Sequence, residues 1–262
     1  MGTILTLEDN VNLIYTEATR QIAPYTPILY MPSAKREGSI DAVGSSILFR
    51  REDRYYLITA GHCIKQDGNL IGIGVLDKRD FHQLRGKVVI GKGEGDKIDI
   101  GIIRLDESSQ AVCLRNYTFL DDTQILLNRW ISDETEYLIA GYPLTKESID
   151  HKRNKLKVGL LPYLSKSSPA TLYGRMGYPH HQNLLLAYDR RRSGFVEGGD
   201  MNMSPHPKGL SGCGIWHVPD YFVEDIQKVQ FNLSSILIEY HRDRRTIIAT
   251  KFEVVQLLLL SI

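Results

Sequence analysis

Three short segments of this chain contain the residue types that nucleophilic catalysis needs. His62 follows the apolar run YYLITAG, Asp99 opens the apolar run DIGIIRL, and Ser211 lies between glycines in KGLSGCG. Each residue alone is more often structural, because aspartates and serines commonly occupy turns and histidines often follow strands. Their occurrence in one chain in the order His, Asp, Ser matches one known arrangement of a catalytic triad. We therefore treat them as candidate catalytic residues.

Each of the three residues has a different role in this kind of catalysis. A serine hydroxyl is a weak nucleophile until a neutral imidazole takes its proton, and a histidine with a pKa near ~6.5 does this around neutral pH. A buried carboxylate fixes the tautomer of that imidazole and stabilises the imidazolium that forms. The pattern therefore predicts Ser211 as nucleophile, His62 as general base and then general acid, and Asp99 as the group that orients His62.

The glycines around Ser211 suit a second requirement, the stabilisation of an oxyanion. Backbone N–H groups that hold an oxyanion must lie in an unusual loop conformation, which a Cβ atom would obstruct. We expect the N–H groups of Gly209 and Ser211 to be the two donors. One such donor typically contributes about 2.7–4 kcal/mol to transition-state stabilisation, so this loop matters nearly as much as the triad.

Short strands rich in Ile, Val, Leu and Tyr must position these residues. From Ala42 onward such runs alternate with Gly, Asp and Asn, and in chain order they are GSSILFR, YYLITA, NLIGIGVL, GKVVIG, DIGIIRL, EYLIAGYP, KLKVGLLPYL, QNLLLAY, CGIWHV, SSILIEY and TIIATKF. Residues 106–130 lack clean alternation and are predicted to connect two all-β halves. His62 and Asp99 fall in the first half and Ser211 in the second.

Both ends of the sequence show helical patterns. The spacing of apolar residues predicts a helix over residues 7–22, after which prolines favour an extended stretch. The last segment, KFEVVQLLLLSI, is rich in helix formers and predicts a terminal helix. We expect three parts: an N-terminal appendage at 1–40, a first β-barrel at 41–118, and a second β-barrel with the C-terminal helix at 119–262.

The three segments together resemble motifs of the trypsin/chymotrypsin family of serine proteases, especially bacterial-type members without a signal peptide. The stretch Thr59-Ala60-Gly61-His62-Cys63 matches the family's TAAHC motif. DIGII at 99–103 matches its DIALL motif, and GLSGCG at 209–214 matches its GDSGGP motif less closely. EYLIAGYP and the ending IIATKFEVVQLLLLSI resemble an early strand of the family's second barrel and its closing strand with the terminal helix. The resemblance spans roughly residues 40–262.

This resemblance implies an all-β, chymotrypsin-like fold of two antiparallel six-stranded β-barrels with a C-terminal helix and the active site between the barrels. It implies a trypsin-like serine endopeptidase, a hydrolase that cleaves peptide bonds through an acyl-enzyme. Family members read substrate side chains with the loop before the serine and the strand after it, which here indicates Pro205, Ser235 and Glu239. A carboxylate of Asp200 or Glu239 in the pocket would favour a basic substrate residue, but the interpretation that the sequence favours is an ordinary exposed acid.

Departures from the family pattern concern activation. Leu210 stands where zymogen-activated members have an aspartate that pairs with a newly cut N-terminus, and no Arg-Ile-Val-Gly-Gly sequence precedes the first barrel, so we expect no such cleavage. Cys63 matches a family cysteine that is often in a disulfide, yet the candidate partner strand GSSILF has no cysteine. Leu210 and Cys213 alter the oxyanion loop. A catalytically silent pseudoprotease that binds a peptide or partner is therefore the alternative function.

The composition limits which classes of partner and which cellular compartment we expect for this protein. The 262 residues are 42% hydrophobic and 24% charged, and the net charge of +1 gives no field to attract nucleic acid or an anionic membrane. The three cysteines are scattered, and the first residues lack a secretory signal, so a cytoplasmic protein is expected. No ligand spacing indicates a metal or another cofactor. The expected partner is a protein or peptide substrate. Because an unregulated cytoplasmic protease would degrade its host, we also expect either narrow specificity or activation by a regulatory protein that docks on residues 1–40.

Overall fold

The elements of the structure follow the predicted pattern closely. The computed structural model describes residues 7–33, 37, 39–64, 71–75, 80–127, 135–144, 148–150, 155–157, 159–189, 195–197, 200–202, 206–218 and 229–262. Its helices are α1 (Leu7–Ile22), α2 (Gly61–Ile64), α3 (Glu107–Asn116), α4 (Ala170–Met176) and α5 (Phe252–Leu259), with short 3₁₀ turns η1 (Ala23–Tyr25), η2 (Glu94–Asp96) and η3 (Asp122–Gln124). The predicted helices at both ends of the chain are confirmed.

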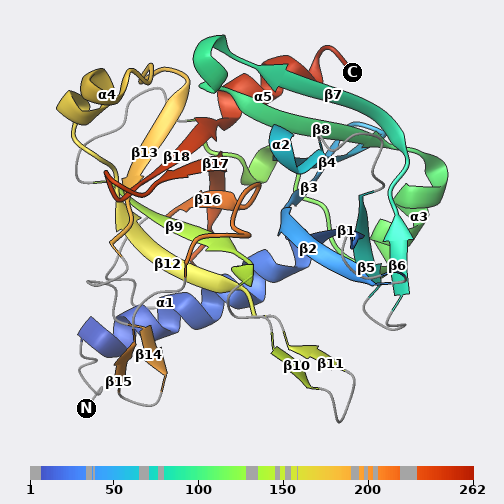
Figure 1. Ribbon diagram of the computed structural model, residues 1–262, viewed down its shortest axis with the longest axis horizontal. Coiled ribbons are helices and arrows are strands. Elements are labelled where there is room, and N and C mark those ends of the chain that lie inside the picture. Colours follow the sequence, from blue (N-terminus) through green and yellow to red (C-terminus); the bar gives the residue numbers. More distant parts are fainter. Residues whose placement is uncertain are drawn as a thin grey trace.

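The first half of the chain forms two four-stranded antiparallel sheets, with strand orders β2-β1-β5-β6 and β3-β4-β8-β7 (Figure 1). The strands are β1 (Ile28–Pro32), β2 (Ile40–Ser45), β3 (Ile47–Arg51), β4 (Arg54–Ala60), β5 (Gly72–Val75), β6 (Asp80–Gln83), β7 (Gly86–Lys92) and β8 (Asp99–Leu105). The chain changes sheets at Ser46, whose backbone N–H and hydroxyl both donate to the carbonyl of Pro27. This change of sheet is why the half divides into four plus four strands rather than forming one six-stranded sheet.

Strand β1 lies inside residues 1–40, the segment expected to stand apart as an appendage. It pairs with both β2 and β5, so the first sheet begins at Ile28. The prolines of this stretch do not prevent pairing, because the one inside the strand, Pro32, is at its last position, where a missing N–H costs least.

The second half is one six-stranded antiparallel sheet of order β12-β9-β16-β17-β18-β13. These strands are β9 (Glu136–Gly141), β12 (Leu161–Lys166), β13 (Asn183–Ala187), β16 (Gly214–His217), β17 (Asn232–His241) and β18 (Thr246–Lys251). The edge strands meet beyond the end of β12, where Ser167 forms an antiparallel bridge with Leu186, so the sheet curls toward closure. Two hairpins stand beside it: β10 (Ser148–Asp150) with β11 (Lys155–Lys157), and β14 (Phe195–Glu197) with β15 (Asp200–Asn202).

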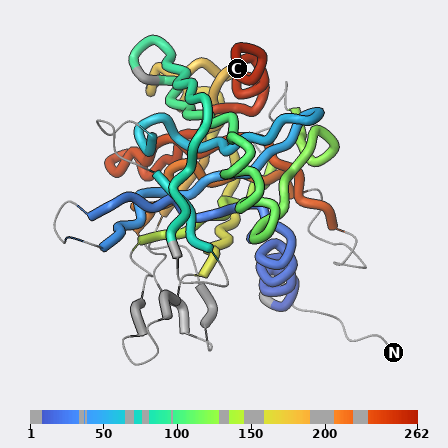
Figure 2. The backbone as a smooth tube through the Cα atoms, turned by 90° about the vertical axis from the view of Figure 1, so that its right-hand side faces the viewer, coloured from blue at the N-terminus to red at the C-terminus, as the bar shows by residue number. Residues whose placement is uncertain are grey.

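Helices α1 and α5 lie at opposite ends of the molecule, as both views show (Figures 1 and 2). In α1, the buried residues Ile14, Ala18 and Ile22 recur every four positions and so share one face, which packs on the core. In α5, Phe252 and Val255 are likewise buried. No helix among the described residues is long and apolar enough to cross a lipid bilayer.

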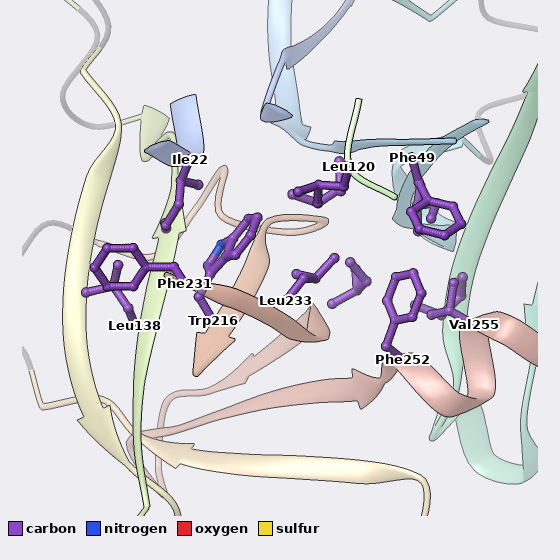
Figure 3. Packing of buried hydrophobic residues seen from close by; sticks show 14 of the residues in the cluster. Ile22, Phe49, Leu120, Leu138, Trp216, Phe231, Leu233, Phe252 and Val255 are labelled. Atoms are coloured by element: carbon purple, nitrogen blue, oxygen red, sulfur yellow. The ribbon is translucent and has the colours of Figure 1, made fainter. Parts of the chain in front are cut away.

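The buried apolar residues form three clusters. One lies within each half, and the largest lies between them and includes residues of α1 and α5. Figure 3 shows this shared cluster, with Trp216 near Ile22 on one side and Phe49 facing Phe252 on the other. The rings of Phe49 and Phe252 meet edge to face, with centroids 5.3 Å apart. Strands β3 and β4 thus bury both faces, which explains their nearly continuous apolar sequences.

Candidate active site

His62 and Asp99 meet because of the register between β4 and β8. Ala60, the last residue of β4, pairs with Ile100 of β8, so Asp99 at the start of β8 faces the turn that follows β4. That turn is helix α2, which carries His62. Nδ1 of His62 lies 2.6 Å from Oδ2 of Asp99, and the backbone N–H of His62 donates to the same oxygen at 3.3 Å. One carboxylate oxygen thus contacts both the ring and the backbone of His62.

Gly61 makes the close approach of this carboxylate possible. A Cβ atom at position 61 would lie 2.4 Å from Oδ1 of Asp99, well inside van der Waals contact. A side chain at this position would push Asp99 away from His62. The glycine that precedes the histidine is therefore part of the geometry of the pair.

The contact with Asp99 raises the pKa of His62. Hydrogen bonding to Asp99 raises the pKa of His62 to about 10; the neighbouring Cys63 thiol adds to this effect, and burial opposes it. The His62 side chain is 51% exposed and that of Asp99 is 16% exposed, so the imidazole faces solvent while the carboxylate is mostly covered. This arrangement stabilises an imidazolium and leaves the ring accessible to a substrate.

Ser211 lies against the segment that carries His62. Its carbonyl accepts a hydrogen bond from the backbone N–H of Ser45 at 2.8 Å and lies 3.9 Å from Sγ of Cys63, the residue after His62. Gly44 lets these groups converge, because a Cβ atom there would be 2.7 Å from Sγ of Cys63 and 2.8 Å from the Ser211 carbonyl oxygen. The three segments that the sequence singles out are therefore neighbours in the fold.

Backbone hydrogen bonds distinguish two N–H groups in the loop around Ser211. Leu210, Gly212 and Cys213 each donate their backbone N–H to a carbonyl. Within the part of the chain that the structure describes, the N–H groups of Gly209 and Ser211 donate to no carbonyl. Gly209 and Gly212 have φ angles of 94° and 86°, a region that residues with a side chain rarely adopt. These are the two N–H groups that the sequence pattern predicts as oxyanion donors.

Leu210 and Cys213 anchor this loop in the second half. Both side chains are fully buried in its apolar cluster, and burial raises the pKa of the Cys213 thiol. All three cysteines are free and buried. The two departures from the family motif are therefore core residues.

The three residues expected to read the substrate have different surroundings. Pro205 lies outside the described residues. Ser235 is fully buried and has no surface for a substrate in this structure. Glu239 has a side chain that is 51% exposed; it accepts a hydrogen bond from the Tyr178 hydroxyl at 3.1 Å and lies 3.7 Å from Nε2 of His241. Of the two described residues, only Glu239 has a side chain that a substrate can reach.

Comparison with solved structures identifies the architecture. The structure of granzyme C matches over 91% of this chain and 93% of its own, with a TM-score of 0.56 and 13% sequence identity. Neuropsin, a serine protease expressed in the limbic system of mouse brain, matches over the same shares with a TM-score of 0.51 and 14% identity. The fold is chymotrypsin-like. No protein-family model and no curated protein matches the sequence, so the likeness is one of fold.

Sequence reasoning did not single out Ser45, which makes two hydrogen bonds to the loop around Ser211. It lies at the end of β2, and its contacts come from segments about 100 and 165 residues further along the chain. Only the small-residue pair Gly44-Ser45 before an apolar strand could have drawn attention to it, and such pairs are common. The chymotrypsin-like fold brings these distant segments together.

Proposed function

We propose that this protein is a serine endopeptidase that cleaves peptide bonds through an acyl-enzyme, with Ser211, His62 and Asp99 as its triad. The observation that carries the proposal is the 2.6 Å contact between His62 and Asp99 in a segment that packs against the backbone of Ser211. The chymotrypsin-like fold supports it, because the Ser-His-Asp arrangement is known on chymotrypsin β-barrels.

Acylation would begin when the Ser211 hydroxyl attacks the substrate carbonyl carbon. Nε2 of His62 takes the hydroxyl proton, while Nδ1–H remains directed to Asp99. The carbonyl oxygen becomes an oxyanion, and the N–H groups of Gly209 and Ser211 would hold it. Collapse of this intermediate breaks the C–N bond, and His62 gives its proton to the leaving amine.

Deacylation repeats these steps with water. His62 takes a proton from a water molecule, the resulting hydroxide attacks the acyl-enzyme carbonyl carbon, and the same two N–H groups hold the second oxyanion. The C–O bond to Ser211 then breaks, and His62 returns the proton to the serine oxygen. The enzyme regains its starting state, and the substrate leaves with a new carboxylate.

Glu239 supports a preference for a basic side chain near the scissile bond. It follows Leu237 on β17, and Leu237 exchanges backbone hydrogen bonds with Gly212 and Cys213, directly after the nucleophile. Two residues along a strand span about 6–7 Å, so Glu239 lies on the same strand a short distance beyond the residue that bonds to this loop. We propose that it pairs with a substrate lysine or arginine and that Tyr178 holds it in place.

Location and regulation are part of the same proposal. Three free, buried cysteines suit a reducing compartment such as the cytoplasm. A regulatory protein would bind the exposed face of α1, since the opposite face is already packed on the core through Ile14 and Ala18.

The test is intact-mass analysis after treatment with a fluorophosphonate, at pH 7 and pH 9.5. An activated serine displaces fluoride from phosphorus and gains the mass of one phosphonyl group. We expect one adduct on the wild type, more rapidly formed at pH 9.5, and none on Ser211→Ala or His62→Ala.

Circular dichroism of all three proteins shows whether the variants remain folded. If the folded wild type forms no adduct at either pH, the endopeptidase proposal is wrong. The pseudoprotease that binds peptides without cleaving them would then be the better interpretation, and Leu210 and Cys213 in the oxyanion loop would be the first residues to examine.

A further inference from the structure

We infer that the side-chain hydroxyl of Ser45 is a positioning group that fixes the oxyanion loop in its catalytic shape. This inference rests on the proposed function, since it concerns how the same site is built. It assigns a role to a residue of the first half that does not itself touch the substrate.

All the polar groups of Ser45 are engaged. Its hydroxyl donates to the carbonyl of Gly209 at 3.0 Å and accepts from the backbone N–H of Tyr142 at 3.0 Å. Its own backbone N–H donates to the Ser211 carbonyl, and its carbonyl accepts from the Thr59 hydroxyl at 2.8 Å. Ser45 is fully buried, so water does not replace any of these bonds when one is lost.

The direction of the Ser45 hydroxyl is determined by its two partners. An amide N–H can only donate, so the Tyr142 N–H must point at a lone pair of the Ser45 oxygen. A carbonyl can only accept, so the hydroxyl proton must point at Gly209. The hydroxyl therefore works as a fixed link between the end of β9 and the oxyanion loop.

The Gly209 carbonyl is the group in this loop whose orientation most needs such a link. Gly209 has a φ of 94° and no side chain, so the peptide planes on either side of it rotate with little steric resistance. The plane before it is held by a bond from the Leu144 N–H to the Lys208 carbonyl at 2.9 Å. The plane after it carries the carbonyl that Ser45 binds. The first bond holds the plane that contains the Gly209 N–H, the first proposed oxyanion donor. The second bond holds the next plane, which links that donor to Leu210 and Ser211.

Loss of the Ser45 hydroxyl would remove one of the two bonds that hold the second plane, whose Leu210 N–H also donates to the Pro207 carbonyl at 3.0 Å. It would leave the Gly209 carbonyl and the Tyr142 N–H without this partner. The plane could then turn, and the N–H groups of Gly209 and Ser211 would no longer point at one oxygen. Displacements of about 1 Å in such arrangements reduce rates by up to about 10²-fold. Among the described residues, the loop around Ser211 is the only part of the proposed site to which the Ser45 hydroxyl is bonded. Its loss should therefore slow the chemical step.

Ser46 provides a matched control. It is the next residue, is also fully buried, and its hydroxyl donates to the Pro27 carbonyl at 2.9 Å, within the first half. Removing either hydroxyl deletes a buried hydrogen bond to a backbone carbonyl, and removing that of Ser45 also deletes the bond from the Tyr142 N–H. Only the Ser45 hydroxyl contacts the oxyanion loop.

The experiment measures the rate of fluorophosphonate labelling of wild type, Ser45→Ala, Ser45→Cys and Ser46→Ala, with thermal stability and an NMR titration of His62. Ser45→Cys keeps the shape of the side chain but is a weak donor and acceptor, and it remains informative if Ser45→Ala does not fold. We expect labelling to be about 10-fold to 100-fold slower in Ser45→Ala and slowed to a smaller extent in Ser45→Cys. Ser46→Ala should label at nearly the wild-type rate, and the pKa of His62 should be the same in all four proteins.

The outcomes separate the two proposals. Suppose that the wild type labels and that Ser45→Ala labels as fast as Ser46→Ala. The inference about Ser45 is then wrong, while the triad stands. Where the alanine variant is unfolded, Ser45→Cys takes its place in this comparison. If the pKa of His62 moves in the Ser45 variants, the hydroxyl acts on the whole site and the inference is also wrong. If the folded wild type does not label at either pH, the proposed function itself fails.

Discussion

One carboxylate oxygen, Oδ2 of Asp99, lies 2.6 Å from Nδ1 of His62 and 3.3 Å from the backbone nitrogen of the same residue. The first prediction concerns this relationship. Asp99→Asn replaces the carboxylate whose hydrogen bond is the main cause of the raised pKa of His62, so the pKa should fall toward about 6.5. An NMR titration of the imidazole protons in both proteins measures this change. An unchanged pKa in Asp99→Asn would show that the ion pair does not form in solution.

The same relationship predicts how activity depends on pH. A base must be neutral to accept a proton, so activity should rise as the pH passes through the pKa of His62. Solvent at the half-exposed ring screens part of the ion pair, and we expect the midpoint of this rise between the ordinary value of about 6.5 and the raised value of about 10. The fluorophosphonate labelling rate as a function of pH gives the midpoint. A midpoint below 6.5 would contradict the raised pKa.

The effect on stability has the opposite pH dependence. The pKa of His62 is raised in the folded state, so its ion pair with Asp99 contributes stability that is complete below the unfolded value of about 6.5. This contribution is lost as the pH rises through the folded value of about 10. Wild type and Asp99→Asn should therefore differ in thermal stability at pH 6 and converge at pH 10.5. A difference that grows with pH would exclude this ion pair as its source.

The second prediction concerns Gly61. In Gly61→Ala, the new Cβ atom would lie 2.4 Å from Oδ1 of Asp99, so the carboxylate must move and its contact with His62 must lengthen. We expect the pKa of His62 to fall and labelling to slow by about tenfold or more. Both quantities are measured as for Asp99→Asn.

Gly174→Ala is the matched control for Gly61→Ala. Gly174 lies in α4 with no atom within 4 Å of the position of its missing Cβ atom. The change should leave labelling unaltered and stabilise the protein by about 0.5–1 kcal/mol, because alanine favours helices. If both glycine variants label at the wild-type rate, Gly61 has no part in positioning Asp99.

The sequence predicts the parts of this molecule that depend on local pattern. The bounds of α1 match the predicted 7–22, and the runs YYLITA and DIGIIRL form β4 and β8. Their register then brings Asp99 to the turn that carries His62. Apolar periodicity and the two flanking motifs were sufficient to predict this contact. Once two antiparallel strands pair in a fixed register, the position of a residue in the sequence determines which residue lies opposite it.

The contacts between distant segments were not predictable in the same way. Ser45 meets Gly209 only because the two halves pack against each other. Helix α3 lies in the predicted connector and has weak apolar periodicity, since it buries few side chains. The strand at Ile28–Pro32 was missed because prolines flank it, and pairing with β2 and β5 outweighs that local signal. Tertiary packing decided all three.

The third prediction follows from the packing of α1. Ile14 is 1% exposed and belongs to the cluster between the halves, whereas its neighbour Leu13 is 38% exposed. Ile14→Ala should therefore destabilise the protein by about 2–5 kcal/mol through loss of buried surface and the cavity left behind. Leu13→Ala should change the free energy of unfolding by about 0.5 kcal/mol or less. Urea denaturation of both variants measures this, and equal effects would mean that α1 does not dock in solution as described.

The fourth prediction concerns Leu210, the residue before the proposed nucleophile. Its side chain is fully buried among apolar residues of the second half. An aspartate there would need a positively charged partner, because a buried carboxylate without one carries a large desolvation cost. Leu210→Asp should therefore unfold the protein or lower its melting temperature by many degrees at pH 7, with partial recovery toward pH 5 as the carboxyl group is protonated.

The same substitution at an exposed leucine separates the effect of burial from that of charge. Leu257 in α5 is 68% exposed, so Leu257→Asp should leave the melting temperature within a few degrees of the wild type. Labelling of Leu257→Asp should also proceed at the wild-type rate, because this residue lies outside the proposed site. If Leu210→Asp were instead stable and labelled faster than the wild type, a charged partner for position 210 must exist near the loop. The apolar anchor at Leu210 would then be a substitute for an ion pair that the rest of the site still supports.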